Sequence, residues 1–326
     1  MRGSALITGA TGFVGSHLVE RLAAGGWHCR ALVRPTSDTA TLERFGVERA
    51  AGSLEDADSL RRAMGGVDVV FHLAAVTTAP DQAGYFRANA EGTQRVVDAL
   101  LAAEPRPRRL VYLSSYAACG PARGSAPRRA DEPPEPLTAY GRSKLAGEAP
   151  VRDLARHGVD AVILRAPAVY GPGDRAFLPY FRLVNRRLAP SPSGPERRVH
   201  LIHVEDLARA LARAAEVAPG TYPVADPVEH RWSAVVEQIS RALGRRPVTV
   251  PLPPALVRLA GAAAERMGDL LGGAGVFNRE KAEELLAPAW VCDLAGSAAL
   301  LPPSEATPLE RGIERTAQWY RTNGWL

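Results

Sequence analysis

The chain has 326 residues, of which 46% are hydrophobic and 23% are charged, and its formal net charge is +5. This length is enough for about two domains, and the hydrophobic fraction is enough for a buried core. Its basic residues occur as scattered pairs without interleaved aromatic residues, which argues against nucleic acid as a partner.

Targeting and redox features are sparse. No stretch approaches the roughly 20 uncharged apolar residues of a membrane helix, so no transmembrane segment is expected. No signal peptide is expected either, because Met1-Arg2 leads directly into the first predicted strand. Cys29, Cys119 and Cys292 are odd in number, far apart in the sequence and without metal-ligand spacing. We therefore expect a reduced, cytoplasmic protein without a metal site.

The first predicted strand is followed at once by a glycine-rich segment, Gly9-Ala10-Thr11-Gly12-Phe13-Val14-Gly15, and then by a helical pattern. Glycines permit a tight turn and let a pyrophosphate approach the N–H groups at a helix start, where the helix dipole is positive. Between a strand and a helix, such a segment predicts a dinucleotide site. The cofactor contacts expected there are Gly9, Thr11, Gly12, Phe13, Val14 and Gly15.

Strand and helix patterns alternate to about residue 165, as a doubly wound parallel sheet requires. The predicted strands are 4–8, 28–33, 47–51, 67–72, 109–114 and 160–164. Beyond this point the elements are shorter and contain many prolines. The sequence therefore predicts an α/β fold of the Rossmann type. Residues 1–165 are expected to form the dinucleotide-binding domain, and residues 166–326 mainly a smaller substrate-binding part interleaved with the first.

The end of the second predicted strand bears on the choice of cofactor. Arg34 stands about 20 residues after the glycine-rich segment, where an acidic residue would bind the ribose 2′-OH of NAD. An arginine can instead hold a 2′-phosphate by charge-assisted hydrogen bonds, so NADP is the predicted cofactor. NAD is the alternative, with Arg34 stacked beside the adenine.

A tyrosine and a lysine form the candidate catalytic pair. Lys144 and Lys281 are the only lysines among 40 lysine and arginine residues, and Lys144 follows Tyr140 by four positions. On a helix this spacing places both side chains on one face. A cation beside a phenol lowers the pKa of the phenol and makes it a usable proton donor near neutral pH. The alternative interpretation is a solvated pair on a surface helix, which the dinucleotide site disfavours.

With these motifs the chain resembles the extended short-chain dehydrogenase/reductase family, also called the epimerase/dehydratase-like family. The glycine spacing is that of the family, and further matches follow in the right order over essentially the whole chain. They are His72-Leu73-Ala74-Ala75, Asn89-Ala90-Glu91-Gly92-Thr93, Val111-Tyr112-Leu113-Ser114-Ser115, Leu164-Arg165, Tyr170-Gly171-Pro172-Gly173-Asp174 and His203-Val204-Glu205-Asp206-Leu207.

The resemblance implies roles for individual residues. Tyr140 is expected to be the proton donor, Lys144 its partner and Ser115 the catalytic serine. Asn89 is expected to open a helix and to support the active site, although it could equally serve as a helix N-cap. Ser114 is expected to pair locally at the end of its strand. Further predicted cofactor contacts are Ser53, which replaces an adenine-binding aspartate of many relatives, Leu54, Leu73, Ala74, Ala75 and Pro167.

Departures from the family pattern bear on the reaction. Sugar-nucleotide dehydratases follow the catalytic serine or threonine with Asp-Glu, whereas Tyr-Ala follows Ser115. Relatives that bind nucleotide-sugars carry an asparagine at the position of Ala168 and an arginine at that of Val199, although Arg198 is adjacent. The polar clamp for a diphosphate is thus depleted, and the substrate pocket is predicted to be apolar.

We therefore expect an NAD(P)-dependent oxidoreductase that reduces a carbonyl, or oxidises a secondary alcohol, of a hydrophobic small molecule. In these features the chain looks similar to dihydroflavonol-reductase-like and hopanoid-associated members of the family. The alternatives are a nucleotide-sugar 4-epimerase that keeps NAD tightly bound, and a non-catalytic member that only binds NADP(H).

Two segments of the second half carry further expectations. The loop 120–137 is expected to overhang the active site. The helical stretch 254–271 is expected to cap the substrate pocket, and a dimer-forming or membrane-surface role is the alternative. The protein is expected to form a homodimer.

Overall fold

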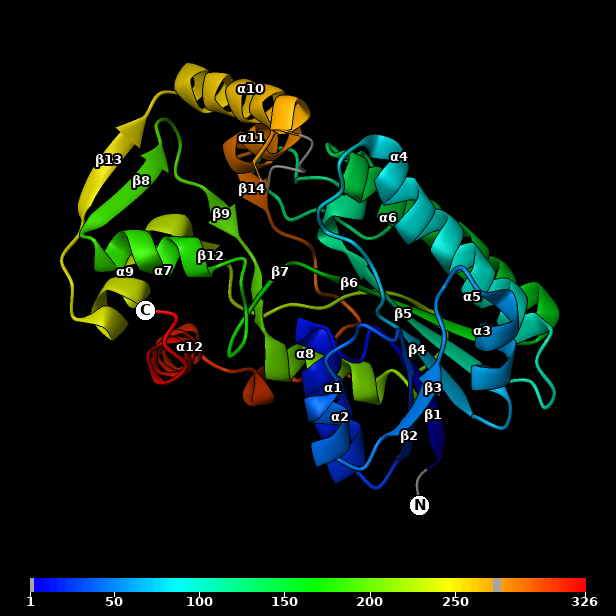
Figure 1. Cartoon of the computed structure of the whole chain (residues 1–326). Coiled ribbons are helices and arrows are strands. Elements are labelled where there is room, and N and C mark those ends of the chain that lie inside the picture. Colours follow the sequence, from blue (N-terminus) through cyan, green and yellow to red (C-terminus); the bar gives the residue numbers. More distant parts are fainter. Residues whose placement is uncertain (1–2, 272–276) are drawn as a thin grey trace.

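The central element of the fold is a seven-stranded parallel sheet, in the order β11-β6-β5-β4-β1-β2-β3 (Figure 1). The structure, a computed structural model, describes residues 3–271 and 277–326, so Met1 and Arg2 lie outside the described residues. All the predicted strands are in this sheet, with the bounds β1 (Ser4–Thr8), β2 (His28–Val33), β3 (Glu48–Ala51), β4 (Val69–His72), β5 (Arg109–Ser115) and β6 (Asp160–Ala166). The edge strand β11 (Gly220–Pro223) comes from the second half of the chain.

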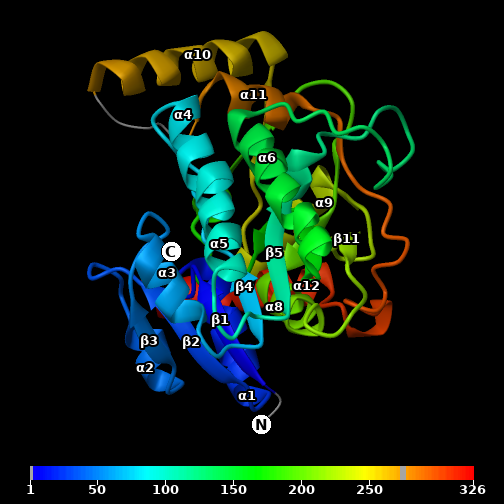
Figure 2. The ribbon, with the colours of Figure 1, turned by 90° about the vertical axis from the view of Figure 1, so that its right-hand side faces the viewer.

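Helices cover both faces of the sheet. Because side chains alternate along a strand, Ile7 of β1 points to the core beneath α1 (Phe13–Ala24) and α8 (Val204–Arg213). Its neighbour Leu6 points to the core on the other face, beneath α3 (Ala57–Met64), α5 (Gly92–Leu101) and α6 (Ala139–Asp153). Figure 2 shows α5 and α6 side by side over that face. The apolar runs of the strands thus reflect burial on both faces.

The strand order reverses between β1 and β4, which lie next to each other in the sheet. β1 continues through β2 to β3 in one direction, and β4 continues through β5 to β6 in the other. In sheets of this kind, ligands bind in the crevice outside the carboxyl ends of the strands at the reversal point. The predicted doubly wound fold of the Rossmann type is confirmed, and it places the candidate site at this crevice.

One predicted helix start is wrong. A continuous helical segment begins with α4 (Gln82–Tyr85), passes through a π-helical turn (Phe86–Glu91) and continues as α5. Its N-cap is Asp81, whose carboxylate accepts the N–H of Gly84 at 2.6 Å. Asn89 therefore lies inside the helical segment and cannot be an N-cap.

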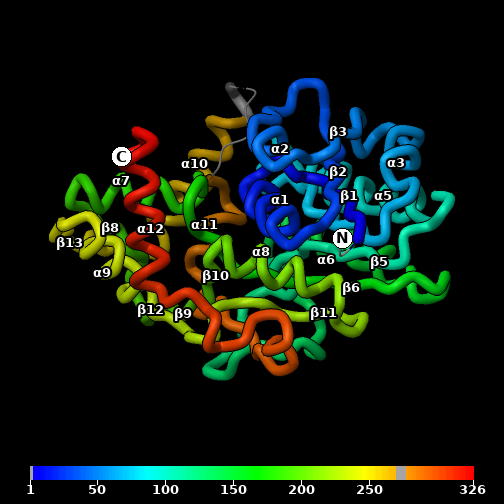
Figure 3. The backbone as a smooth tube through the Cα atoms, turned by 90° about the horizontal axis from the view of Figure 1, so that it is seen from below, coloured from blue at the N-terminus to red at the C-terminus, as the bar shows by residue number. Residues whose placement is uncertain are grey.

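The second half of the chain adds a smaller layer of helices and short strands. Its core combines aliphatic and aromatic side chains, and the rings of Phe181 and Tyr320 lie edge to face at 5.0 Å. Figure 3 shows α12 running beside the region of α7 and α9, which pack together. Its elements are β7 (Ala168–Tyr170), α7 (Leu178–Asn185), β8 (Leu188–Pro192), β9 (Arg198–Val199), β10 (Leu201–His203), β12 (His230–Arg231), α9 (Trp232–Leu243), β13 (Val248–Leu252), α10 (Pro254–Leu271), α11 (Arg279–Leu286), β14 (Ala289–Trp290) and α12 (Leu309–Thr322). Short segments elsewhere are α2 (Ala40–Arg44) and single 3₁₀ turns at 116–118, 154–157 and 303–305.

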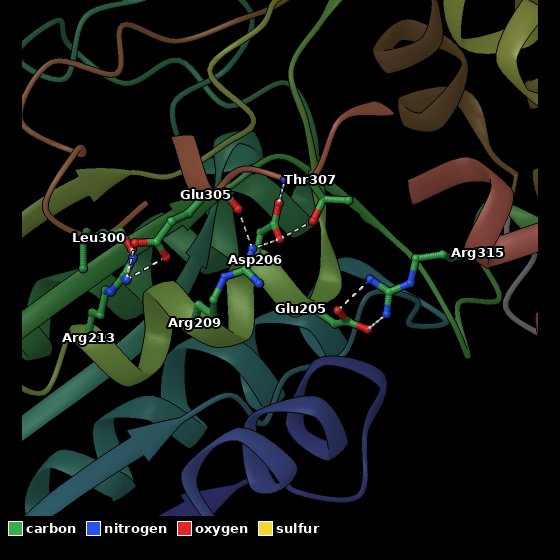
Figure 4. Close-up of polar contacts among 8 residues, drawn as sticks. All are labelled: Glu205, Asp206, Arg209, Arg213, Leu300, Glu305, Thr307 and Arg315. Atoms are coloured by element: carbon green, nitrogen blue, oxygen red, sulfur yellow. Dashed lines mark hydrogen bonds and ion pairs between the residues drawn. The ribbon is translucent and has the colours of Figure 1, made fainter. Parts of the chain in front are cut away.

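A polar network attaches α8 to the C-terminal segment (Figure 4). Asp206, which is 1% exposed, accepts the N–H and the hydroxyl of Thr307, both at 2.7 Å. Arg209 also pairs with Asp206, and Glu205 pairs with Arg315 of α12. Burial raises the pKa of Asp206. The acidic residues of the His203–Leu207 motif thus join the parallel-sheet layer to the end of the chain.

The position of β11 bears on domain organisation. This strand pairs in parallel with β6, although 53 residues separate Ala166 from Gly220 along the chain. α8, which precedes β11, packs on α1 of the first half. Both features agree with an interleaved second part, while the boundary at residue 165 stays a prediction.

α10 lies on α11 at the outer edge of the molecule (Figure 1). Its side chains Leu256, Leu259 and Met267 are exposed. Within the described ranges, no helix is long and apolar enough to cross a membrane.

Candidate active site

The glycine-rich segment joins β1 to α1 with little space for side chains. Gly9 has a φ of +75°, and a Cβ there would lie 2.7 Å from the backbone nitrogen of Ala74. A Cβ on Gly15 would lie 2.0 Å from the carbonyl oxygen of Gly9. The N-cap of α1 is Gly12, which has no side chain to bind the first N–H groups of the helix. These open amides at a positive helix end fit the pyrophosphate of a dinucleotide.

The other predicted cofactor residues follow the carboxyl ends of neighbouring strands. Arg34 follows β2 directly, and its side chain is exposed. No ion pair or side-chain hydrogen bond of its guanidinium is found in the described part of the chain. The remaining residues follow β3, β4 and β6, and are Ser53, Leu54, Leu73, Ala74, Ala75 and Pro167. This arrangement along one edge of the sheet fits an extended dinucleotide, and the individual contacts stay predictions.

Ser115 and Tyr140 come together at the carboxyl end of β5. Ser115 is the last residue of β5, and its Oγ accepts the N–H of Ala117 at 3.1 Å. Tyr140 is in the first turn of α6, whose N-cap Thr138 accepts the N–H of Gly141 at 3.0 Å. Burial raises the pKa of Tyr140 to about 12, while hydrogen bonding with Ser115 lowers it. The phenol is therefore protonated at neutral pH, as a proton donor must be.

The close packing of α6 on the turn after Ser115 depends on a glycine in α6. A Cβ on Gly141 would lie 2.3 Å from the carbonyl oxygen of Ala117, in the turn that follows Ser115. Any larger residue would push α6 away from that turn. Gly141 therefore helps to set the distance between the serine and tyrosine hydroxyls.

Lys144 lies one turn after Tyr140 and is only 2% exposed. Its Nζ is 4.2 Å from the centroid of the Tyr112 ring, which is a cation–π geometry. Burial lowers the pKa of Lys144 to about 7, while the charge of Glu148 raises it. That Lys144 lowers the pKa of Tyr140 stays a prediction. Its ammonium lies over the Tyr112 ring, and burial dominates at the Tyr140 phenol.

Asn89 holds the start of α6 without touching the phenol. Its Nδ2 donates to the carbonyl of Val76 and to Ser143 Oγ, both at 3.0 Å, and its Oδ1 accepts the N–H of Val76 at 2.8 Å. The Ser143 hydroxyl in turn donates to the carbonyl of Tyr140 at 2.7 Å. Asn89 thus links the loop after β4 to the backbone of Tyr140, from a π-helical turn of the kind often found at functional sites.

A buried histidine, to which the sequence assigned no role, lies beneath the same region. The Thr93 hydroxyl donates to the carbonyl of Asn89 at 2.6 Å, so His72 Nε2 must donate to Thr93 Oγ1, 3.0 Å away. His72 Nδ1 then accepts the proton of Thr8 Oγ1 at 2.7 Å. Burial, followed by the charge of Lys144, lowers the pKa of His72 to about 3. The ring is therefore neutral, and it stacks on Tyr112 with the centroids 5.4 Å apart.

Sequence reasoning also missed Glu148, which is fully buried in α6. Its carboxylate accepts the Ser114 hydroxyl at 2.6 Å and two hydrogen bonds from Arg165, at 2.9 and 2.8 Å. The prediction that Ser114 pairs locally is therefore wrong. The signal that could have revealed Glu148 is the four-residue spacing of Lys144, Glu148 and Arg152, which places all three on one helix face.

Side chains near Tyr140, and those expected at the substrate pocket, come from several elements. The ring of Tyr85 in α4 lies edge to face with the Tyr140 ring at 6.2 Å. The charge of Glu284 in α11 also raises the pKa of Tyr140. Ala168, expected at an apolar pocket wall, is exposed in β7, and Arg198 is paired with Glu229 at 3.0 Å.

The loop 120–137 pairs with a segment near the end of the chain. Ala122 donates its N–H to the carbonyl of Ala289 at 2.9 Å, and Arg128 to that of Val291 at 3.0 Å. These bonds fasten the loop along residues 289–293, and its expected overhang of the active site stays a prediction. All three cysteines are free and buried.

Comparison with known proteins identifies the family. A family model described as the NAD dependent epimerase/dehydratase family matches residues 5–225. The chain belongs to this family. It is therefore an NAD(P)-dependent enzyme, as the resemblance of its motifs to the extended short-chain dehydrogenases/reductases implied.

Relatives of this chain include two proteins that are named as reductases. The chain is 34% identical to the ceramide reductase of Caulobacter vibrioides over 337 residues, which cover 100% of this chain and 96% of the relative. It is 32% identical to a ketoreductase of Stigmatella aurantiaca that acts on 4-hydroxy-2-methyl-3-oxo-4-farnesyl-3,4-dihydroquinoline-1-oxide, over 66% of this chain and 65% of the relative.

Solved structures share the whole fold. The crystal structure of gox2253 is similar with a TM-score of 0.82 and 25% identity, covering 100% of both chains. MoeE5, in complex with UDP-glucuronic acid and NAD, is similar with a TM-score of 0.75 and 26% identity, covering 98% of this chain and 100% of MoeE5. Both reductases and a protein that binds a nucleotide-sugar are thus among the similar proteins.

Proposed function

We propose that this family member reduces a ketone carbonyl of a hydrophobic small molecule with NADPH, or oxidises the corresponding secondary alcohol. The observation that carries the proposal is the close packing of the first turn of α6, which holds Tyr140, against the turn that follows Ser115 at the carboxyl end of β5, with the phenol protonated. The names of the two reductase relatives, which include a ceramide and a farnesylated ketone, support a substrate of this class.

The residues have complementary roles in this proposal. Bound in the crevice, the nicotinamide cofactor supplies the hydride. Ser115 Oγ hydrogen-bonds the substrate oxygen while negative charge gathers on it, and the Tyr140 hydroxyl donates its proton to that oxygen. Lys144 lies on the same helix face, and its charged ammonium stabilises the phenolate that Tyr140 becomes after it donates its proton. Asn89 and Ser143 keep the backbone of Tyr140 in place.

Two features of the substrate side oppose a nucleotide-sugar. Ala168 offers no hydrogen bond where nucleotide-sugar-binding relatives have an asparagine. Arg198, the remaining candidate for a diphosphate clamp, is held by Glu229 and by the carbonyl of Gly124. For the cofactor, the exposed Arg34 at the end of β2 supports NADP over NAD.

The test is Tyr140→Phe, assayed by NADPH consumption on a panel of hydrophobic ketones that includes a 3-oxo derivative of ceramide. We expect kcat to fall by at least about 10²-fold with cofactor affinity nearly unchanged, because only the proton is lost. Tyr222→Phe, which removes a hydroxyl bound to the carbonyl of Ala218, is the matched control and should keep full turnover. Normal turnover by Tyr140→Phe would show that Tyr140 is not the proton donor.

A nucleotide-sugar 4-epimerase is the second candidate, because of the similarity to MoeE5. Thermal unfolding of the NADP-loaded protein separates the two functions, since a bound substrate raises the melting temperature. Hydrophobic ketones should raise it and UDP-sugars should not. Stabilisation by a UDP-sugar, with tightly bound NAD and no net consumption of NADPH, would favour the epimerase. The third alternative, a non-catalytic member, is opposed by the intact Ser115, Tyr140 and Lys144.

A further inference from the structure

We propose that Glu280 of α11 is a positioning residue for Tyr140, through which α11 holds the first turn of the catalytic helix. This inference rests on the proposed function of Tyr140. It concerns a contact between residues more than a hundred positions apart, so no local sequence pattern reveals it.

The carboxylate of Glu280 binds both sides of Tyr140. Its Oε2 accepts the backbone N–H of Ala139 at 2.5 Å, and its Oε1 accepts Nη2 of Arg142 at 2.6 Å. Ala139 immediately precedes Tyr140, and Arg142 follows it by two residues. A carboxylate at this place is also favoured by the positive end of the α6 dipole.

Glu280 complements the local cap of α6. The first N–H groups of a helix have no partner within the helix. Thr138 binds the N–H of Gly141 from within the same segment, whereas Glu280 binds that of Ala139 from α11. One local and one distant side chain thus bind the N–H groups on either side of Tyr140, in addition to the bond from Ser143 to its carbonyl, and the orientation of this turn depends in part on the docking of α11.

α11 is itself fastened to α10. A Cβ on Gly261 of α10 would lie 2.8 Å from the carbonyl oxygen of Asn278, so the two helices are in close contact. Arg258 of α10 also pairs with Glu283 of α11 at 2.7 Å. The α10–α11 pair therefore forms one unit, and Glu280 connects this unit to the catalytic helix. Glu283 has no such link to α6, because its described ion pair is with α10.

The experiment compares Glu280→Gln with Glu283→Gln in the full-length protein loaded with NADPH. In Glu280→Gln, one of the two oxygens that accept from Ala139 and Arg142 becomes an NH2 group, which cannot accept, so one contact is lost and the first turn of α6 should loosen. We expect kcat to fall about tenfold, the effect of one lost charge-assisted hydrogen bond, with the KM for NADPH unchanged. Glu283→Gln should keep both constants.

A second readout does not depend on activity. Hydrogen–deuterium exchange of a peptide that contains residues 139–142 should be faster in Glu280→Gln and unchanged in Glu283→Gln, because the Ala139 N–H loses its charged acceptor. If Glu280→Gln folds poorly, Arg142→Gln removes one of the two contacts and should change kcat and exchange in the same direction.

The outcomes separate the two proposals. If Tyr140→Phe is inactive but Glu280→Gln matches Glu283→Gln in kcat and in exchange, the inference is overturned and the proposed function stands. If Tyr140→Phe keeps normal turnover, the proposed function falls and the positioning role falls with it. Faster exchange together with a lower kcat and an unchanged KM supports the inference.

Discussion

The charge on Lys144 is set by two opposing effects, burial, which lowers its pKa to about 7, and the charge of Glu148, which raises it. An ammonium that assists Tyr140 is present only below this pKa, so reduction should slow as the pH rises through about 7. Removing the negative charge of Glu148 should lower the pKa of Lys144 further. In Glu148→Gln, the falling limb of the kcat–pH profile should therefore move to lower pH.

The control for this profile is Asp153→Asn. Asp153 is in the same helix as Glu148, but its carboxylate is exposed and pairs with Arg156. Its profile should match that of the unchanged protein. A limb that stays in place in Glu148→Gln would show that another group than Lys144 sets the pH dependence.

Arg34 allows the cofactor preference to be tested. Arg34→Asp replaces a cation with a carboxylate at the end of β2, where a ribose 2′-phosphate would lie. NADPH binding should weaken by about 2–3 kcal/mol, from a lost charge-assisted contact and an added repulsion, while NADH binding should be spared. The measurement is the dissociation constant of each cofactor by calorimetry. Equal affinities for NADPH and NADH in the unchanged protein would contradict the assignment.

Functional residues that belong to a local sequence motif could be predicted, and residues whose partners are distant in the sequence could not. The sequence shows the spacing of Tyr140 and Lys144 and the serine at the end of the fifth strand. The partners of Glu148 in β5 and β6 and the hydrogen bonds of His72 are not, because each joins residues that only the folded sheet brings together.

The turn from β1 to α1 offers a matched pair of substitutions at the scale of the element. A Cβ on Gly15 would lie only 2.0 Å from the carbonyl oxygen of Gly9, which is a clash with backbone. A Cβ on Gly12 would lie 3.2 Å from the same oxygen, which is a much looser contact. Gly15→Ala should therefore lower the melting temperature by several degrees, since backbone must move. Gly12→Ala should keep the melting temperature close to that of the unchanged protein but weaken cofactor binding, since the added methyl stands at the open helix end.

Thermal unfolding and cofactor titration of both variants check this expectation. Equal losses of stability in Gly12→Ala and Gly15→Ala would contradict it.

The attachment of α8 to the C-terminal segment can be tested in the same way. Asp206→Asn replaces a buried carboxylate that binds Thr307 and Arg209, and should lower the free energy of unfolding by about 2 kcal/mol. Glu205→Gln breaks a more exposed pair with Arg315 and should cost less than about 1 kcal/mol. Urea unfolding measures both, and equal effects would show that burial does not decide the strength of these contacts.

Strands were easier to predict than the helix around Asn89. The six strands are short apolar runs bounded by turn residues, and burial on both faces produces that pattern directly. The helical segment from Gln82 contains a π-helical turn, which shifts the side-chain period and hides the true start.

Acid should destabilise the whole molecule. Burial lowers the pKa of His72 to about 3 and those of His200 and His203 to about 4. In the unfolded chain, histidine pKa values are near 6.5. Between that pH and the lower pKa values of the folded protein, the unfolded chain binds more protons, so the free energy of unfolding decreases as the pH falls below about 6.5. Asp174, whose pKa burial raises to about 6, and Asp206 act in the opposite direction. Because the histidines outnumber these two carboxyl groups, stability should fall.

Urea unfolding at pH 7.5, 6 and 5 measures the effect, which should be on the order of 1–2 kcal/mol for each histidine by pH 5. His200→Gln should flatten the dependence, whereas His28→Gln, which changes an exposed histidine, should leave it unchanged. A free energy of unfolding that is constant over this range would contradict the expectation.

The position of β11 decides how this chain can be recombined with its relatives. A hybrid gene joined at residue 165 would pair β6 of one parent with β11 of the other, and would place α8 of one parent on α1 of the other. A mismatch there would leave β6 as an unpaired edge, which invites aggregation. A transplant of substrate preference should therefore keep residues 204–223 with the recipient and exchange the segments on either side of them.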